Sequence, residues 1–195
     1  WEACSMGIKK KDAPVSSTGV RSKLLRRTEA GFPFFIQRAM KITADCIDAW
    51  KEILARVPDS YIHFKSGDYS PARRTWLADG FGDYRHRILF DFNTSHHEHM
   101  LWYQDVDLAL DPWPQCGGVS TLEALARGVV TVTWLGARMN QRSSGSFMTL
   151  VGFADDCVAH SRQDYIDKAV ALVTTKRDRL AEMRACGQQR MQESP

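Results

Sequence analysis

Short apolar segments alternate with amphipathic helical segments along residues 31–195, and this alternation limits the possible folds more than any other feature. The apolar segments are rich in Val, Ile, Leu and Phe, which is typical of buried strands. A helix between consecutive strands is the pattern of βαβ units, whose strands run parallel. We therefore expect an α/β fold with a parallel, Rossmann-like sheet and helices on both faces.

The limits of these segments follow from local signals, with Thr43 as a helix N-cap and Pro58 ending that helix. The expected strands are FPFFI (32–36), SYIHFK (60–65), RILFDF (87–92), VDLALD (106–111), GVVTVTWL (128–135) and DDCVA (155–159). The expected helices span 43–57, 70–82, 95–104, 141–152, 162–173 and 176–191, and another begins at Ser120. Residues 1–30 are polar and basic, and we expect a poorly ordered lead-in there, followed by one domain over 31–195.

Composition excludes several classes of function. The formal net charge of +3 is too small to indicate nucleic-acid binding. No apolar run is long enough to span a bilayer, so we expect no membrane partner. The five cysteines are scattered without CxxC spacing, which argues against a disulfide framework or a structural zinc site and favours a cytoplasmic location.

Ligands of parallel α/β sheets bind at the carboxyl ends of the strands. The loops to inspect are therefore 37–41, 93–99, 111–121 and 135–142. P-loop, GxGxxG and GxSxG motifs do not occur in them or elsewhere in the sequence.

The stretch DPWPQCGGVSTLEAL (111–125) has features of a phosphate site. Gly117 and Gly118 would let a ligand approach the backbone, and Ser120 and Thr121 would begin a helix whose free N–H groups attract an anion. Glu123 would lie in the first turn, within reach of a ribose hydroxyl. An ordinary turn followed by an ordinary helix cap explains the same residues equally well.

Four further residues are ambiguous when taken alone. His96 and His99 could share a helix face as metal ligands, lie at the surface, or pack against a base or ribose, and a metal site is the least favoured because only Cys116 offers a further ligand. Lys41 could neutralise a diphosphate, but taken alone it is better explained as a surface lysine before a helix, and Arg142, at another helix start, is equally ambiguous.

Taken in order, several segments resemble a known family. They are AMKIT…CIDAWKEILARVPDSYI, HHEHMLWYQDVDLALDPWPQCGGVSTLEALARGVVTVTWLG, QRSSGSFMTLVGFADDCVA and QDYIDKAVAL. Together they resemble the C-terminal catalytic lobe of the O-linked N-acetylglucosamine transferase / SPINDLY family over residues 31–195. The resemblance implies the C-terminal half of a GT-B glycosyltransferase.

The resemblance also implies a donor site. In that family a lysine at the position of Lys41 neutralises the donor diphosphate during catalysis, and a polar residue precedes it at Arg38. The positions that would bind the donor nucleotide are Thr94 at the base, His96 at the ribose, His99 at the nucleoside, Gly117, Gly118, Val119, Ser120 and Thr121 at the phosphates, Glu123 at the ribose, and Arg142.

Four residues depart from the family pattern. Val119 replaces a threonine, Cys116 an asparagine, Trp102 an arginine and Val130 a proline. The family's N-terminal lobe and TPR repeats, which bind the acceptor protein, have no counterpart in this sequence.

The function implied is the donor-binding lobe of an inverting protein O-glycosyltransferase. It would transfer a sugar from a UDP-sugar to serine or threonine residues of proteins. The most favoured sugar is N-acetylglucosamine. We expect neither a cofactor nor a metal ion. The alternatives are a non-catalytic nucleotide-binding or scaffold fragment and a GT-B transferase with another acceptor.

Overall fold

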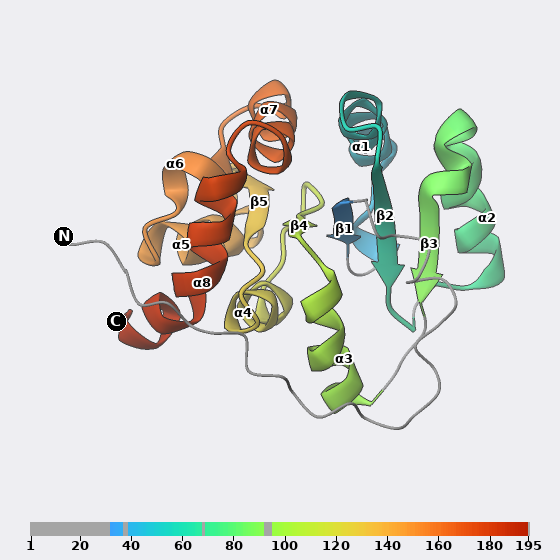
Figure 1. The fold of residues 1–195 in the computed structure, drawn as a ribbon. Coiled ribbons are helices and arrows are strands. Elements are labelled where there is room, and N and C mark those ends of the chain that lie inside the picture. Colours follow the sequence, from blue (N-terminus) through green and yellow to red (C-terminus); the bar gives the residue numbers. More distant parts are fainter. Residues whose placement is uncertain (1–31, 37–38, 68, 92–94, 195) are drawn as a thin grey trace. The chain divides into compact units, whose positions relative to one another are not determined.

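The computed structural model describes residues 32–36, 39–67, 69–91 and 95–194 (Figure 1). The predicted lead-in at 1–30 lies outside these residues. The strands are β1 (Phe32–Ile36), β2 (Ser60–Lys65), β3 (Ile88–Asp91), β4 (Leu108–Leu110), β5 (Thr131–Trp134) and β6 (Val158–Ala159). The α-helices are α1 (Ala44–Arg56), α2 (Pro71–Gly80), α3 (His96–Trp102), α4 (Val119–Ala126), α5 (Ser143–Leu150), α6 (Ala154–Cys157), α7 (Arg162–Val173) and α8 (Arg177–Glu193).

The described strands form one parallel sheet with the order β3-β2-β1-β4-β5-β6. The chain moves outward from β1 to β3, then crosses back through α3 to place β4 on the free side of β1. Phe34 of β1 pairs with Leu108 of β4 in this crossing. The strand order therefore reverses between β1 and β4, and the predicted Rossmann-like α/β class is confirmed.

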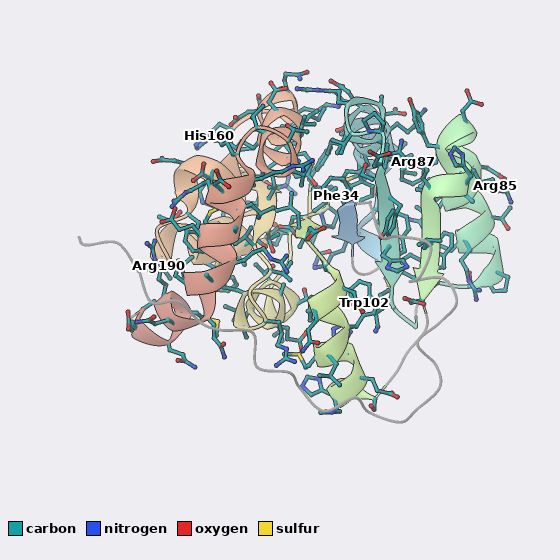
Figure 2. All side chains as sticks on the ribbon, in the orientation of Figure 1. Phe34, Arg85, Arg87, Trp102, His160 and Arg190 are labelled. Carbon is teal, nitrogen blue, oxygen red and sulfur yellow. The ribbon has the colours of Figure 1, made fainter. Side chains whose placement is uncertain are left out.

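Helices cover both faces of the sheet. His63 and Phe64 are consecutive on β2 and so point to opposite faces. The ring of Phe64 lies 6.1 Å from that of Trp50 on α1. The ring of His63 lies 5.4 Å from that of Trp102. Trp102 is the last residue of α3 and is labelled in Figure 2. Because the Trp50 indole donates to the Tyr165 hydroxyl of α7, α7 lies with α1. The α4 helix packs against α8.

The first helix shows how the sequence sets local structure. The Thr43 side chain accepts a hydrogen bond from the Cys46 N–H and caps α1, as predicted. The helix ends at Arg56, two residues before Pro58. Its apolar face is fully or almost fully buried, as the residues Ile47, Trp50, Ile53, Leu54 and Val57 show.

One expected strand is wrong in its first part. In the segment DDCVA only Val158–Ala159 pair with β5, and Ala154–Cys157 form α6. The Phe153 carbonyl accepts the N–H of Asp156, which closes a helical turn. Asp155 and Asp156 also place negative charge at the amino end of that turn, where the helix dipole favours it.

No helix in the described ranges combines the length and the hydropathy needed to cross a membrane.

Candidate functional site

A small recess opens at the point where the strand order reverses. It lies beyond the carboxyl ends of β1 and β4, where open α/β sheets bind their ligands. We call it the switch-point recess, and it is lined by Lys41, Ala109, Leu110, Asp111, Pro112, Gly117, Thr121 and Thr131.

One peptide unit at this recess is held from both ends. The Lys41 ammonium donates to the carbonyl oxygen of Cys116, with 2.6 Å between Nζ and O. The N–H of the next residue, Gly117, donates to the Asp111 carboxylate, with 2.6 Å between N and Oδ1. The Cys116–Gly117 peptide therefore lies between a cation and an anion, and both of its polar groups are fixed.

Asp111 is a buried acid at the end of β4. It is 4% exposed, and its second carboxylate oxygen accepts a hydrogen bond of 2.8 Å from the Thr133 hydroxyl. Burial raises the pKa of Asp111 to about 6, against hydrogen bonds from Ser144, Thr133 and Gly117 and the charge of Lys41, which favour the carboxylate. Near neutral pH the carboxyl group is mostly ionised, and a change in its surroundings that raises its pKa further would protonate it.

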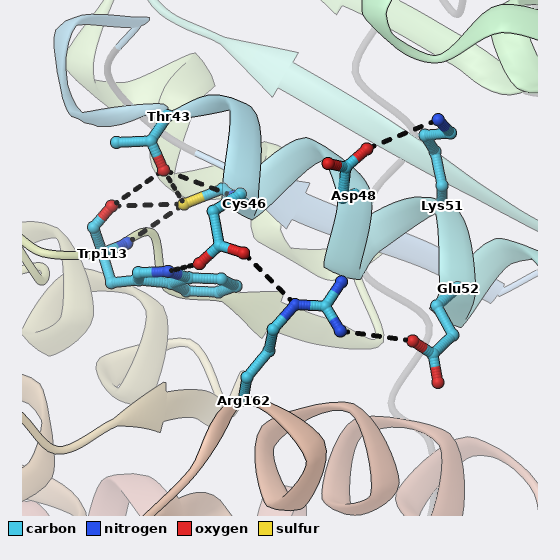
Figure 3. Close-up of polar contacts among 8 residues, drawn as sticks. Thr43, Cys46, Asp48, Lys51, Glu52, Trp113 and Arg162 are labelled. Atoms are coloured by element: carbon cyan, nitrogen blue, oxygen red, sulfur yellow. Dashed lines mark hydrogen bonds and ion pairs between the residues drawn. The ribbon is translucent and has the colours of Figure 1, made fainter.

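The loop 112–118 is fixed to the first helix as well. The Trp113 indole donates to the Asp45 carboxylate at 2.6 Å, and the Trp113 backbone N–H donates to the Cys46 sulfur at 3.3 Å (Figure 3). Arg162 of α7 pairs with Asp45 at 3.3 Å from the other side (Figure 3). The Cys116 N–H donates to the Asn140 carbonyl at 3.2 Å, which joins this loop to the one after β5.

The amino end of α4 adjoins the recess, which Gly117 and Thr121 line, and it has no side-chain cap. The helix begins at Val119, one residue before the expected start, and its N-cap is Gly118. The Thr121 hydroxyl is engaged with the Ser144 hydroxyl at 2.8 Å and does not cap the helix. The Thr121 N–H donates to the Gly118 carbonyl at 3.0 Å, so the N–H groups of Val119 and Ser120 and the helix dipole remain available to an anion.

Gly117 is required for this packing. A Cβ atom added there would lie 2.2 Å from Thr121 Oγ1, 3.1 Å from Ser144 Oγ and 3.2 Å from Asp111 Oδ1. At Gly118 an added Cβ would meet nothing within 4 Å. The two glycines therefore differ: Gly117 permits close packing, whereas the position of Gly118 is open.

Two histidines of α3 face the acid on α4. The nearest nitrogen–oxygen distances to the Glu123 carboxylate are 3.9 Å for His96 and 3.7 Å for His99. Burial and the nearby charge of Lys65 lower the pKa of His99, whose ring also packs edge-on against Tyr103 with 5.1 Å between centroids. Glu123 lies past the first turn, so its predicted place in that turn is wrong, because α4 starts at Val119.

The predicted site residues thus fall into groups. Lys41, Gly117 and Thr121 line the switch-point recess. Gly118, Val119 and Ser120 form the amino end of α4, and His96, His99 and Glu123 lie together beside it. The exposed Arg142 donates to the Gly136 carbonyl at 2.9 Å, in the loop after β5. Arg38 and Thr94 lie outside the described residues, so their predicted roles stay predictions.

No group of three or more potential metal ligands occurs among the described histidines, cysteines and acids.

Sequence reasoning missed the groups beneath the loop. It assigned Asp111 no role of its own, although its carboxylate accepts the Gly117 N–H and its carbonyl accepts the Tyr165 hydroxyl at 3.1 Å. A single acid directly after an apolar strand was the only available signal. Nothing local connects it to Tyr165, Thr133 or Ser144.

Comparison with known proteins gives the same picture. Residues 29–195 match the sequence profile described as glycosyl transferase family 41. The chain belongs to this family.

Other members of family 41 resemble the chain at moderate identity. It is 29% identical over 139 residues to a tomato (Solanum lycopersicum) protein named "Probable UDP-N-acetylglucosamine--peptide N-acetylglucosaminyltransferase SPINDLY", and 30% identical over 139 residues to the Arabidopsis thaliana protein of the same name. Each match covers 69% of this chain and 15% of the relative. The resemblance found in the sequence is confirmed, and the chain spans about one seventh of the relatives' length.

Solved structures agree on the fold. A mutant of the Thermobaculum terrenum O-GlcNAc transferase superposes with a TM-score of 0.76 at 26% identity, covering 84% of this family 41 chain and 32% of that protein. The C-terminal domain of a glycosyl transferase group 1 protein from Francisella tularensis superposes with a TM-score of 0.60 at 16% identity, covering 84% of each chain. The second likeness concerns the fold alone.

Proposed function

We propose that residues 32–195 bind the nucleotide-sugar donor of a protein O-glycosyltransferase, with UDP-N-acetylglucosamine as the donor. The observation that carries this proposal is the meeting of the Lys41 ammonium, the Cys116–Gly117 peptide and the uncapped amino end of α4 at one recess. A cation beside free helix N–H groups is suited to a diphosphate. The names of the SPINDLY relatives support the choice of sugar and nucleotide.

In the proposed reaction a serine or threonine hydroxyl attacks the anomeric carbon of the sugar. The bond from that carbon to the diphosphate oxygen breaks, the electron pair leaves with UDP, and the configuration inverts. Lys41 and the first N–H groups of α4 would stabilise the charge that develops on the diphosphate. His96 and Glu123 would position the ribose, and His99 would lie against the nucleoside.

Acceptor binding and proton removal would be carried out by a second lobe, which the family resemblance implies. That lobe would bind the acceptor protein and supply the base that takes the hydroxyl proton. An association with TPR repeats and a cytoplasmic location belong to the same proposal. The free, buried thiols of Cys46, Cys116, Cys157 and Cys186 support a reducing compartment.

Calorimetric titration of the chain with UDP, GDP and UDP-N-acetylglucosamine tests the proposal. We expect micromolar binding of UDP and of the UDP-sugar, and weaker binding of GDP. Lys41→Ala should lower the affinity for UDP by at least about tenfold, because a hydrogen bond to a charged group contributes about 1.5–3 kcal/mol.

The matched control is Lys51→Ala, which removes an exposed lysine of α1 that pairs with Asp48. It should leave UDP affinity unchanged. A folded wild-type chain that binds none of the three nucleotides would contradict the proposal.

One observation favours a second candidate, a module that binds a nucleotide without transfer. Val119 is 73% exposed at the amino end of α4 and brings no hydroxyl to the phosphate site. Val119→Thr tests this reason for the second candidate. If the phosphate site is weakened by the missing hydroxyl, this variant should bind UDP several-fold more tightly, and unchanged affinity would remove the reason for the second candidate.

A further inference from the structure

The Cys116–Gly117 peptide lies between two oppositely charged side chains and forms a hydrogen bond with each of them. Lys41 approaches it from the loop after β1 and binds its carbonyl, and Asp111 approaches from the end of β4 and binds its N–H. Both charged side chains also line the switch-point recess. A ligand that engages the ammonium will therefore change the surroundings of the carboxylate.

We infer that Asp111 is a positioning residue of the donor site, which orients the Gly117 peptide for the diphosphate and takes up one proton from solvent when the donor binds. This inference rests on the proposed function, because it needs a diphosphate in the recess. It assigns to Asp111 no contact with the reacting atoms.

The orienting role follows from how completely Asp111 is fixed. Its backbone N–H donates to Val132, its carbonyl accepts from Tyr165, and its carboxylate accepts from Thr133 and Gly117. The Asp111 side chain is therefore held in one position beside the loop 112–118. Without its Oδ1 acceptor the buried N–H of Gly117 would lose its partner, and the adjoining amino end of α4 would lose its support.

The proton uptake follows from charge. A diphosphate in the recess would place negative charge beside the carboxylate and would draw the Lys41 ammonium toward itself. Like charge and the loss of a compensating cation both raise a carboxyl pKa. The pKa of Asp111 is already raised to about 6 by burial, so a modest further rise protonates it at neutral pH. The new carboxyl O–H can donate to Thr133 Oγ1 while Oδ1 still accepts from Gly117.

Among the described residues, the other titratable groups that face Asp111 are Lys41 and Tyr165. Lys41 faces it from the loop after β1, and Tyr165 faces it from α7, where burial raises the pKa of the phenol well above its ordinary value. The side chains from β5 and α5, Thr133 and Ser144, are hydroxyls. The carboxyl group is thus the one of this set that can gain a proton near neutral pH.

Calorimetry of the full chain with UDP-N-acetylglucosamine measures this proton directly. A nucleotide sugar carries no phosphate monoester, so its phosphates do not titrate near pH 6. Titration at pH 7 in two buffers of different ionisation enthalpy gives the number of protons taken up. For the wild type we expect a positive number of at most one, and an affinity that falls as the pH rises from 6 to 8, by at most about tenfold per pH unit.

Asp111→Asn keeps the Oδ1 acceptor without the charge. It should bind the donor several-fold more tightly than the wild type at pH 8, and its proton uptake should be smaller by the share that Asp111 provides. The difference in proton uptake between the wild type and Asp111→Asn separates Asp111 from the other ionisable groups of the chain. Asp111→Ala, checked for folding by its circular dichroism, should lose at least about tenfold in affinity because the Gly117 N–H loses its acceptor.

The outcomes separate this inference from the proposed function. A wild type that binds no nucleotide refutes the proposed function, and the inference with it. A wild type that binds the donor with the same proton uptake and the same pH profile as Asp111→Asn refutes the inference alone. So does a folded Asp111→Ala chain that binds as tightly as the wild type.

Discussion

Replacement of Asp111 by asparagine should remove a pH dependence of stability that lies between about pH 4 and pH 6. The ordinary pKa of this carboxyl is 3.8, and in the folded chain burial raises the pKa to about 6. Between these two values the native state keeps a proton that the unfolded state has released. The free energy of unfolding of the wild type should therefore fall as the pH rises through this window.

The size of the effect follows from the two pKa values. The difference between 3.8 and about 6, at 1.36 kcal/mol per pKa unit, corresponds to about 3 kcal/mol. This destabilisation is fully present above pH 6 and absent below pH 4. Asparagine can still accept from Gly117 and donate to Thr133, so the variant loses the titration while keeping both contacts.

Urea unfolding followed by far-UV circular dichroism, at several pH values from 4 to 8, measures this effect. The free energy of unfolding is taken from each midpoint and slope. Other groups titrate in the same range, so the quantity of interest is the difference between the wild type and Asp111→Asn. Asp83→Asn makes the same chemical change at an exposed site and should follow the wild-type curve. Parallel curves for the wild type and Asp111→Asn would refute the reasoning.

Two further substitutions test the packing beneath the loop. Gly117→Ala should destabilise the chain by about 1–3 kcal/mol and abolish UDP binding, because its Cβ would lie 2.2 Å from Thr121 Oγ1. Thermal melting measures the loss of stability, and calorimetry measures the loss of binding. Gly118→Ala, whose Cβ meets nothing within 4 Å, is the control for stability. A stable Gly117→Ala chain that binds UDP would contradict this packing. Tyr165→Phe should cost about 1–3 kcal/mol in urea unfolding, because it leaves the buried Trp50 indole N–H without its acceptor, and an unchanged midpoint would show that this hydrogen bond is unimportant.

Most elements could be predicted because their signals are local. Thr43 and Pro58 set the limits of α1, and the apolar spacing of the helix identifies its buried face. The segment DDCVA lacked such signals, being too short for its period to separate helix from strand. The choice there depended on the Phe153 carbonyl, which closes the turn of α6.

The site could be predicted only in part, for a physical reason. The rule that ligands bind where strands end selected the loops that contain Lys41 and Gly117, and the family resemblance then gave Lys41 its role. Which side chains support those residues depends on how distant elements pack, and no pattern in the sequence relates Asp111 to Tyr165 of α7. The exact start of α4 was also missed by one residue, which moved Glu123 out of the first turn.

The anchoring of loop 112–118 has a consequence for binding entropy. Trp113 is tied to α1, Cys116 to the loop after β5 and to Lys41, and Gly117 to Asp111. Fixing the backbone of one residue costs about 1–2 kcal/mol. For this loop the cost is met when the chain folds, so an arriving diphosphate finds its partners preorganised. Loosening the loop at Trp113, which does not line the switch-point recess, would then weaken affinity without removing a contact to the ligand.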